Sequence, residues 1–473
     1  MEALTEIPVE LTGDATPEEK WLAAAAKWDD LAGSPTYEWV HLDLFRTLGI
    51  PEVIREASGK DIWDRSKALL QQPGMKPQAL LGQMKVEVMC STDDPTDLLD
   101  DHRRLAESDL QTRVYPTYRP DRAMNIFKPD WRDYITLLEK RVNGKFKKIE
   151  DLLDALRITH DYFAEHGCVA TDHGVEVPYG VDFKREDADA AFCKAYNGEA
   201  LSRLEEIQYM SCILDAVAAL NSEKNWVFQL HIGAVRNVRN SLFDNYGSDS
   251  GGDLSTHTID IVTPLRDLLN RYDGRLKVVL YCLDPGHQTS ITTLARAFGA
   301  TVNVGAAWWF NDAPAGMKQH LEYIGEVDLL ANFAGMVSDS RKLVSYASRH
   351  EMFRRVLGDV VGQTIALRRV EHGEALQERD AVRILPGLPG AELLVVRRET
   401  VGIADDRSLL PAPDMASCLL SLPISQPALR CVTLFDPGGP KDQNIDAGID
   451  PARYPIVRHR AGTPRGIPRL YPR

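Results

Sequence analysis

The sequence predicts an α/β protein built on a parallel (β/α)₈ barrel of the TIM type. Three observations carry this prediction: β-rich runs recur along the chain, several are apolar almost throughout, and helical patterns separate them. Strands covered on both faces are apolar in this way. Strand–helix alternation on this scale is typical of a parallel sheet. The length of 473 residues is sufficient for such a barrel with additions.

The expected elements follow one another in regular alternation. Strands are expected at 85–92, 113–119, 168–174, 226–233, 277–284, 302–309 and 331–339. Helices are expected at 135–142, 148–166, 199–221, 260–272, 316–327 and 348–365. Seven strands leave one strand of an eight-stranded barrel unseen.

The two ends of the chain depart from this alternation. Residues 17–80 are expected to be helical, with Thr16 as the N-cap and Pro17 at the first helical position of the first helix. From Pro386 onward the chain holds nearly half of its 27 prolines and a single lysine, with no clear period. We therefore expect an incomplete barrel over 1–385 and a Pro/Arg-rich tail over 386–473, with a strand or two near 391–399.

Composition excludes several classes of protein. The net charge of −14, with interspersed acidic residues, argues against nucleic acid as a partner, because phosphate binding needs a basic face. The seven cysteines are scattered and contain no C-x-x-C pair, which predicts neither a disulfide framework nor a zinc knuckle. The start of the chain has no apolar signal region, and no apolar run is long enough for a membrane span. We expect a cytoplasmic protein.

Polar and aromatic residues gather where the predicted strands end. In a parallel barrel, function collects at the carboxyl ends of the strands. An Asp that follows a strand is often only a helix cap, and we prefer that interpretation for Asp94 and Asp284, which both precede proline. The residues at these ends are Thr92, Asp93, Asp94, Arg119, Asp172, His173, His231, Asp284, Trp308, Trp309, Asp339 and Arg341.

Asp339 is the strongest candidate among these residues. It ends the last apolar run, in "FAGMVSDSRK", so its carboxylate is expected to point into the mouth of the barrel. A carboxylate there can bind a metal or transfer a proton. The alternative is a salt bridge with Arg341, which lies two residues on and thus on the same side of an extended chain.

For four further candidates, a purely structural role is the alternative to a functional one. His231 in "QLHIG" could be a hydrogen-bonded core histidine rather than a functional one. The stem of Arg119 could cover apolar surface, although its guanidinium suits a substrate carboxylate. Trp308 and Trp309 lie on opposite sides of a strand, so one can pack outward while the other walls a pocket.

Taken together, several motifs resemble the uronate (glucuronate) isomerase family of the amidohydrolase superfamily. They are "YPTYRPDRAM", "TDHGVEVPYG", "FQLHIGAVRNVRN", "NVGAAWWFNDAPAGM" and "GMVSDSRKLVSYASRHEMFRR". "LTGDATPEEKW" and "GSPTYEWVHLDLFRTLGI" are similar to the helical insertion that follows the family's first strand, here at about 10–80. The resemblance covers residues 10–365 roughly and in order.

The resemblance implies an aldose–ketose isomerase acting on a sugar acid. The family interconverts D-glucuronate with D-fructuronate, and D-galacturonate with D-tagaturonate, and usually carries one divalent metal, commonly zinc. It implies that Asp339 is the metal-proximal carboxylate and that Arg341 and Arg119 bind the substrate. His231, Trp308, Trp309 and, from the insertion, His41 are implied as lining residues. Proton transfer through a cis-enediol needs a proton carrier, here Asp339, and a donor for the enediolate oxygens.

The sequence also departs from the family. The family's first strand carries a His-x-His pair that binds the metal, and this sequence has no His-x-His. We therefore expect a barrel that lacks its first strand and a zinc site that is weakened or lost. We also expect the reading frame to begin upstream of Met1 and the tail to be disordered or out of frame. The alternatives are a catalytically impaired remnant and a metal-dependent hydrolase of the same superfamily. A homo-oligomer is compatible with the sequence.

Overall fold

The computed structural model describes residues 15–248, 250–340 and 342–372. All of them belong to one of the two units into which the chain divides, Met1–Phe435. The expected tail, and with it the boundary at residue 385, lies outside the described residues.

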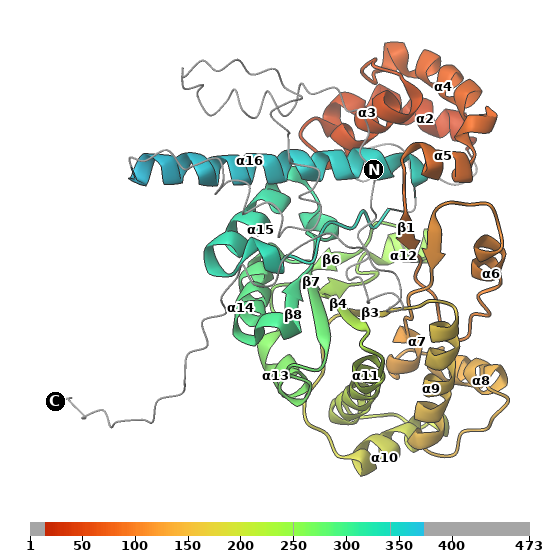
Figure 1. Ribbon diagram of the computed structural model, residues 1–473. Helices are drawn as coiled ribbons and strands as arrows, with labels where there is room; N and C mark the ends of the chain where they lie inside the picture. The colour runs from red at the N-terminus through yellow and green to blue at the C-terminus, as the bar shows by residue number, and fades with distance from the viewer. Residues whose placement is uncertain (1–14, 249, 341, 373–473) are drawn as a thin grey trace. The chain divides into compact units, whose positions relative to one another are not determined.

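Parallel strands in sequence order form the centre of this unit (Figure 1). A sheet of four runs in the order β3-β4-β7-β8, and β1 pairs with β2 beside it. Isolated parallel bridges from Tyr118 to Asp93 and Thr171 join the two sheets, and a bridge from Val304 to Phe333 adds the last segment. The strands are β1 (Val88–Cys90), β2 (Arg113–Tyr115), β3 (Ala170–Val175), β4 (Val227–Ile232), β7 (Lys277–Cys282) and β8 (Val302–Val304).

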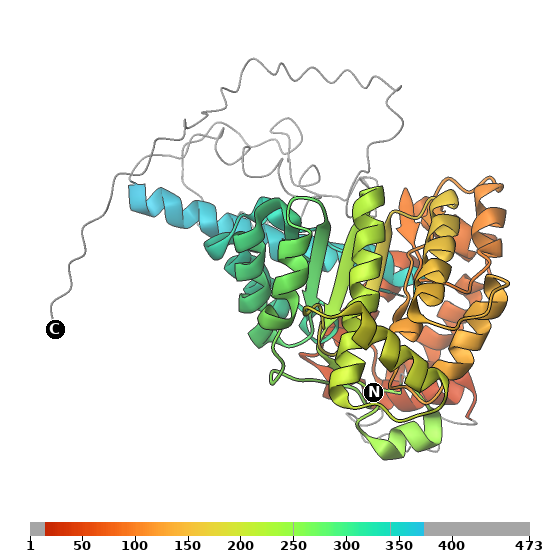
Figure 2. The ribbon, with the colours of Figure 1, turned by 90° about the horizontal axis from the view of Figure 1, so that it is seen from below.

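Helices alternate with these strands and flank them (Figure 2). They are α6 (Asp100–Ala106), α7 (Asp121–Met124), α8 (Trp131–Arg141), α9 (Ile149–Glu165), α10 (Arg185–Tyr196), α11 (Arg203–Lys224), α13 (Val262–Arg271), α14 (Gln288–Phe298) and α15 (Pro314–Val327). This is the (β/α) barrel architecture that the sequence predicts. An antiparallel pair, β5 (Ala234–Val235) and β6 (Leu254–Ser255), with α12 (Asn240–Tyr246) between its strands, was not predicted.

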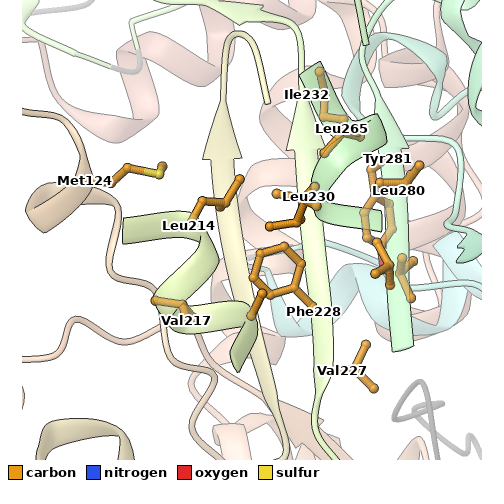
Figure 3. Packing of buried hydrophobic residues seen from close by; sticks show 14 of the residues in the cluster. Met124, Leu214, Val217, Val227, Phe228, Leu230, Ile232, Leu265, Leu280 and Tyr281 are labelled. Atoms are coloured by element: carbon orange, nitrogen blue, oxygen red, sulfur yellow. The ribbon is translucent and has the colours of Figure 1, made fainter. Parts of the chain in front are cut away.

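The main core lies between the strands and their helices. Phe228 and Leu230 of β4 are fully buried and, in Figure 3, lie opposite Leu214 and Val217 of α11. Each such side chain stabilises the fold by roughly 1.5–3 kcal/mol relative to exposure. Because side chains alternate along a strand, His231 faces away from this core, toward the barrel interior.

The predicted helical insertion is present. It contains α2 (Pro17–Ala26), α3 (Pro35–Leu48), α4 (Glu56–Leu70) and α5 (Pro77–Gln83), with its own small core that includes Trp28 and Ile54. Thr16 is the N-cap of α2 and forms a capping box with Glu19, and Pro17 is the first residue of the helix, as predicted. Helix α3 contacts α16 (Tyr346–His372), the last described element.

The prediction of a strand over 331–339 is wrong in its extent. Only Phe333 bridges to β8, with the Ala334 N–H donating to the Val304 carbonyl at 2.8 Å. Gly335 and Asp339 have φ of 101° and 42°, which are incompatible with an extended ladder. The apolar composition of this segment reflects its burial rather than strand pairing.

Gly305 provides a test of the packing under the barrel mouth. A Cβ at this position would lie 2.3 Å from Cε1 of Tyr281. We expect Gly305→Ala to lower the free energy of unfolding by about 1–3 kcal/mol, measured by urea denaturation, because the ring has no space to retreat. Gly82→Ala in α5 is the control: nothing lies within 4 Å of its Cβ, and it should leave stability unchanged or raise it by up to ~1 kcal/mol. Equal denaturation midpoints for both variants would contradict the prediction.

Candidate active site at the carboxyl ends of the strands

A buried carboxylate in the middle of β3 forms the centre of the candidate site. Asp172 Oδ2 lies 2.6 Å from Nη2 of Arg119, and Asp172 Oδ1 lies 2.7 Å from Nδ1 of His231. The carboxylate therefore joins Arg119, which follows β2, to His231 near the end of β4.

Strand register explains this arrangement. Asp172 is the β-ladder partner of Gln229, and His231 lies two residues further along β4 on the same face. His231 is in turn the partner of Tyr281 on β7, and the two rings stack at 4.2 Å with an angle of 6°. The Tyr281 hydroxyl donates to Gln229 Oε1 at 2.9 Å, which fixes the ring against which the imidazole packs.

The tryptophan pair extends the site to Asp339. Trp308 packs edge-on against His231 at 4.7 Å, and its indole Nε1 donates to Asp339 Oδ2 at 3.2 Å. Trp309 packs beside Trp308 at 5.9 Å, with the guanidinium of Arg236 4.9 Å from its ring centre. An unbroken series of contacts thus runs from Arg119 through Asp172, His231 and Trp308 to Asp339.

Charge pairing keeps the central groups ionised. Burial would raise the pKa of Asp172, but His231 and Arg119 lower it to about 2. Burial would lower the pKa of Arg119, but the carboxylates of Asp172, Asp121 and Asp339 give a net rise. Because ionised Asp172 can only accept, His231 must carry a proton on Nδ1.

Asp121 behaves differently from Asp172. Its Oδ2 accepts the Gly174 N–H at 2.9 Å and lies 3.5 Å from Arg119 Nε, while Oδ1 has no hydrogen-bond partner. Burial raises the pKa of Asp121 to about 7, against the opposing effect of Arg119. Nearby His173 is fully buried, and burial lowers its pKa to about 3. Asp121 therefore lies beside Arg119 and gains its own proton near neutral pH.

The structure brings together four of the residues predicted from the sequence: Arg119, His231, Trp308 and Asp339. Trp309 is adjacent to them. Arg341 lies outside the described residues, so its part in substrate binding stays a prediction.

His41 is not part of this group. Its Nδ1 donates to the Tyr37 carbonyl at 2.7 Å and its Nε2 accepts from the Ile54 N–H at 3.0 Å. Both ring nitrogens are therefore used inside the insertion, and we leave His41 out of the proposed site. Asp284 accepts the Gly286 N–H at 2.8 Å as a cap, as its sequence context predicts.

Sequence reasoning assigned no role to three contributors to the site, although Asp172 was among the residues noted at the predicted strand ends. Asp172 and Asp121 were visible as polar residues in "TDHG" and "RPDRAM", but the pairing partners that give them a role lie on other strands. Tyr281 lies inside an apolar run and gives no sequence signal of its own.

The described residues do not form a metal site. Among them, no three carboxylates, imidazoles or thiolates gather closely enough to hold an ion. Asp339 already accepts a hydrogen bond from Trp308. The zinc suggested by the family resemblance therefore stays a prediction.

The fold and this set of side chains at the strand ends define a TIM-barrel enzyme of the amidohydrolase-like kind. The glucuronate isomerase family model matches residues 5–383, and the chain belongs to that family. The uronate isomerase of Thermotoga maritima is 48% identical over 367 residues, covering 77% of this chain and 80% of its own length. The Marinomonas uronate isomerase is 37% identical over 376 residues, covering 77% and 79%.

Solved structures give the same result. The crystal structure of the Thermotoga maritima uronate isomerase superimposes with a TM-score of 0.77 and 45% identity, covering 83% of this chain and 86% of that one. The structure of glucuronate isomerase from Caulobacter crescentus superimposes with a TM-score of 0.74 and 26% identity. The match covers 81% of this chain and 80% of that one. The family comparisons favour neither a hydrolase nor a non-catalytic remnant.

The unusual pKa of Asp121 predicts a specific pH dependence of stability. A carboxyl with a raised pKa in the folded state contributes stability that is present at low pH and lost as pH rises toward 7. Between pH 4 and 8, the free energy of unfolding of the wild type should therefore fall by roughly 2–4 kcal/mol relative to Asp121→Asn. Urea denaturation at a series of pH values measures this difference. Parallel curves for the two proteins would contradict an ionisation of Asp121 in this range.

Proposed function

We propose that this chain interconverts D-glucuronate with D-fructuronate, and D-galacturonate with D-tagaturonate, by proton transfer between C2 and C1. One observation carries the proposal: in a member of the glucuronate isomerase family, a continuous set of contacts joins Arg119 to Asp339 at the barrel mouth. These two side chains offer a cation for an anionic sugar and a carboxylate for proton transfer.

Asp339 is proposed as the group that moves the proton. Aldose–ketose isomerisation removes a proton from C2 and returns it to C1 through a cis-enediol, while the hydroxyl proton passes from O2 to O1. A single carboxylate can carry the carbon-bound proton. The hydrogen bond from Trp308 holds one oxygen of Asp339, so that the other remains for the substrate.

Arg119 and His231 are proposed to bind the substrate around that carboxylate. The guanidinium of Arg119 suits the uronate carboxylate or an enediolate oxygen. Asp172 holds both the Arg119 guanidinium and Nδ1 of His231. The indole of Trp308 is proposed as an apolar wall beside the sugar, and Arg341 is proposed as a second cation for the sugar acid.

Zinc is retained as a proposed activator with Asp339 as one ligand, to be tested directly. We place the activity in the cytoplasm, which agrees with the five described cysteines being free. No described helix has the length and apolarity to cross a membrane.

The activity is tested by incubating the full chain with D-glucuronate and following ketose formation, with and without zinc and after EDTA treatment. In deuterated water, proton transfer through an enediol should place deuterium on the product wherever the carried proton exchanges with solvent. Absence of ketose under all three metal conditions would refute the proposal. Product release from an amide or lactone instead would indicate a hydrolase.

Replacement of the proposed base is the sharpest single test. We expect Asp339→Asn to lower kcat by about 10²–10⁴-fold, because an amide cannot accept and return the proton. KM should change little, since the amide keeps the shape of the carboxyl. Asp284→Asn is the matched control: this acid also follows a strand but caps a turn, and kcat should stay within about twofold. Activity of Asp339→Asn near the wild-type level would remove Asp339 from the mechanism.

A further inference from the structure

The insertion holds the segment that follows Asp339. Asp43 on α3 accepts hydrogen bonds from the hydroxyls of Ser345, at 2.6 Å, and Ser348. Both serines are buried, and burial raises the pKa of the Asp43 carboxyl against the lowering effect of these hydroxyls. One turn along α3, the Thr47 hydroxyl donates to the Val344 carbonyl at 3.0 Å. Side chains of one helix thereby fix the chain that enters α16.

A buried ion pair connects the same region to the tryptophan segment. Arg349 on α16 pairs with Asp312, and these side chains are only 13% and 4% exposed. Asp312 directly follows the short helix Trp309–Asn311 and forms its C-cap. The guanidinium of Arg349 also lies 4.1 Å from the ring centre of Trp39 on α3. Arg349 thus touches the insertion and the segment that carries Trp308.

The two segments held in this way both contain a strained residue. Trp309 has φ of 48° and Asp339 has φ of 42°, in the left-handed region. Such a conformation in a residue other than glycine persists only when its surroundings enforce it. Strand pairing does not enforce it for Asp339, because its segment has a single bridge, at Phe333.

We propose that the helical insertion positions the catalytic carboxylate, with Asp43 and Arg349 as its positioning residues. Asp43 fixes the segment after Asp339, and Arg349 fixes the segment after Trp308. The Trp308–Asp339 hydrogen bond is the point where both constraints meet. This inference rests on the proposed function only for the role of Asp339.

The consequence is that losing the Asp43 contacts to Ser345 and Ser348 should impair the chemical step more than substrate binding. We expect Asp43→Ala to lower kcat by about 10–100-fold with KM within about threefold, because misplacing a reacting group by about 1 Å has this effect. Asp43→Asn, which still accepts a hydrogen bond, should recover most of kcat. Steady-state kinetics on D-glucuronate measure both variants.

A matched variant separates positioning from general stability. Arg46 lies on the same helix and pairs with Glu351 at 2.7 and 2.8 Å, and Glu351 keeps a second partner in Arg355. Arg46→Met should lower Tm about as much as Asp43→Ala while kcat stays within about twofold. If kcat of both variants falls in proportion to Tm, or if Asp43→Ala retains half of the wild-type kcat, the proposal is overturned.

Hydrogen exchange tests the same coupling without substrate. Asp43→Ala should speed exchange in peptides covering 306–313 and 334–348, whereas Arg46→Met should leave both unchanged. Unchanged exchange in Asp43→Ala would overturn the positioning role. Absence of isomerase activity in the wild-type chain would refute the proposed function alone, because the exchange measurement still reports on the contact.

Discussion

The pairing of the buried Asp172 carboxylate is the interaction on which the site depends. Burying an ionised group costs several kcal/mol of desolvation free energy, which close polar partners offset. Asp172 has two such partners, Arg119 and His231. Its ionised state fixes the tautomer of His231 and the direction of the Arg119 guanidinium together. The three consecutive strands that supply these residues are thus held in register by charge as well as by the β-ladder.

Asp339 is connected to Asp172 by side-chain contacts rather than by backbone pairing. His231 stacks on Tyr281 and supports Trp308, which in turn holds Asp339. The last segment has only one bridge to β8, so these contacts and the insertion carry what a strand ladder would otherwise provide. An isomerase site built in this way depends on its aromatic residues for geometry, not only for an apolar wall.

Local patterns in the sequence predicted most of the fold. A continuous apolar run marked β7 because that strand is buried on both faces. Thr16-Pro17 marked the start of α2 because capping is a local property. The run at 331–339 was misjudged because burial without pairing has the same composition as a strand. Tyr281 and the pairing of Asp121 could not be foreseen, since their roles arise from neighbours on other strands.

Charge balance links the buried groups to the proposed substrate. A uronate is an anion, the chain carries a net −14, and Asp121, Asp172 and Asp339 surround a single described guanidinium, that of Arg119. Three full negative charges there would repel the sugar acid. Because burial raises the pKa of Asp121 to about 7, this carboxyl is partly neutral at physiological pH. Asp172 is already matched by Arg119, so the charge that the substrate meets is mainly that of Asp339, the group proposed to react with it.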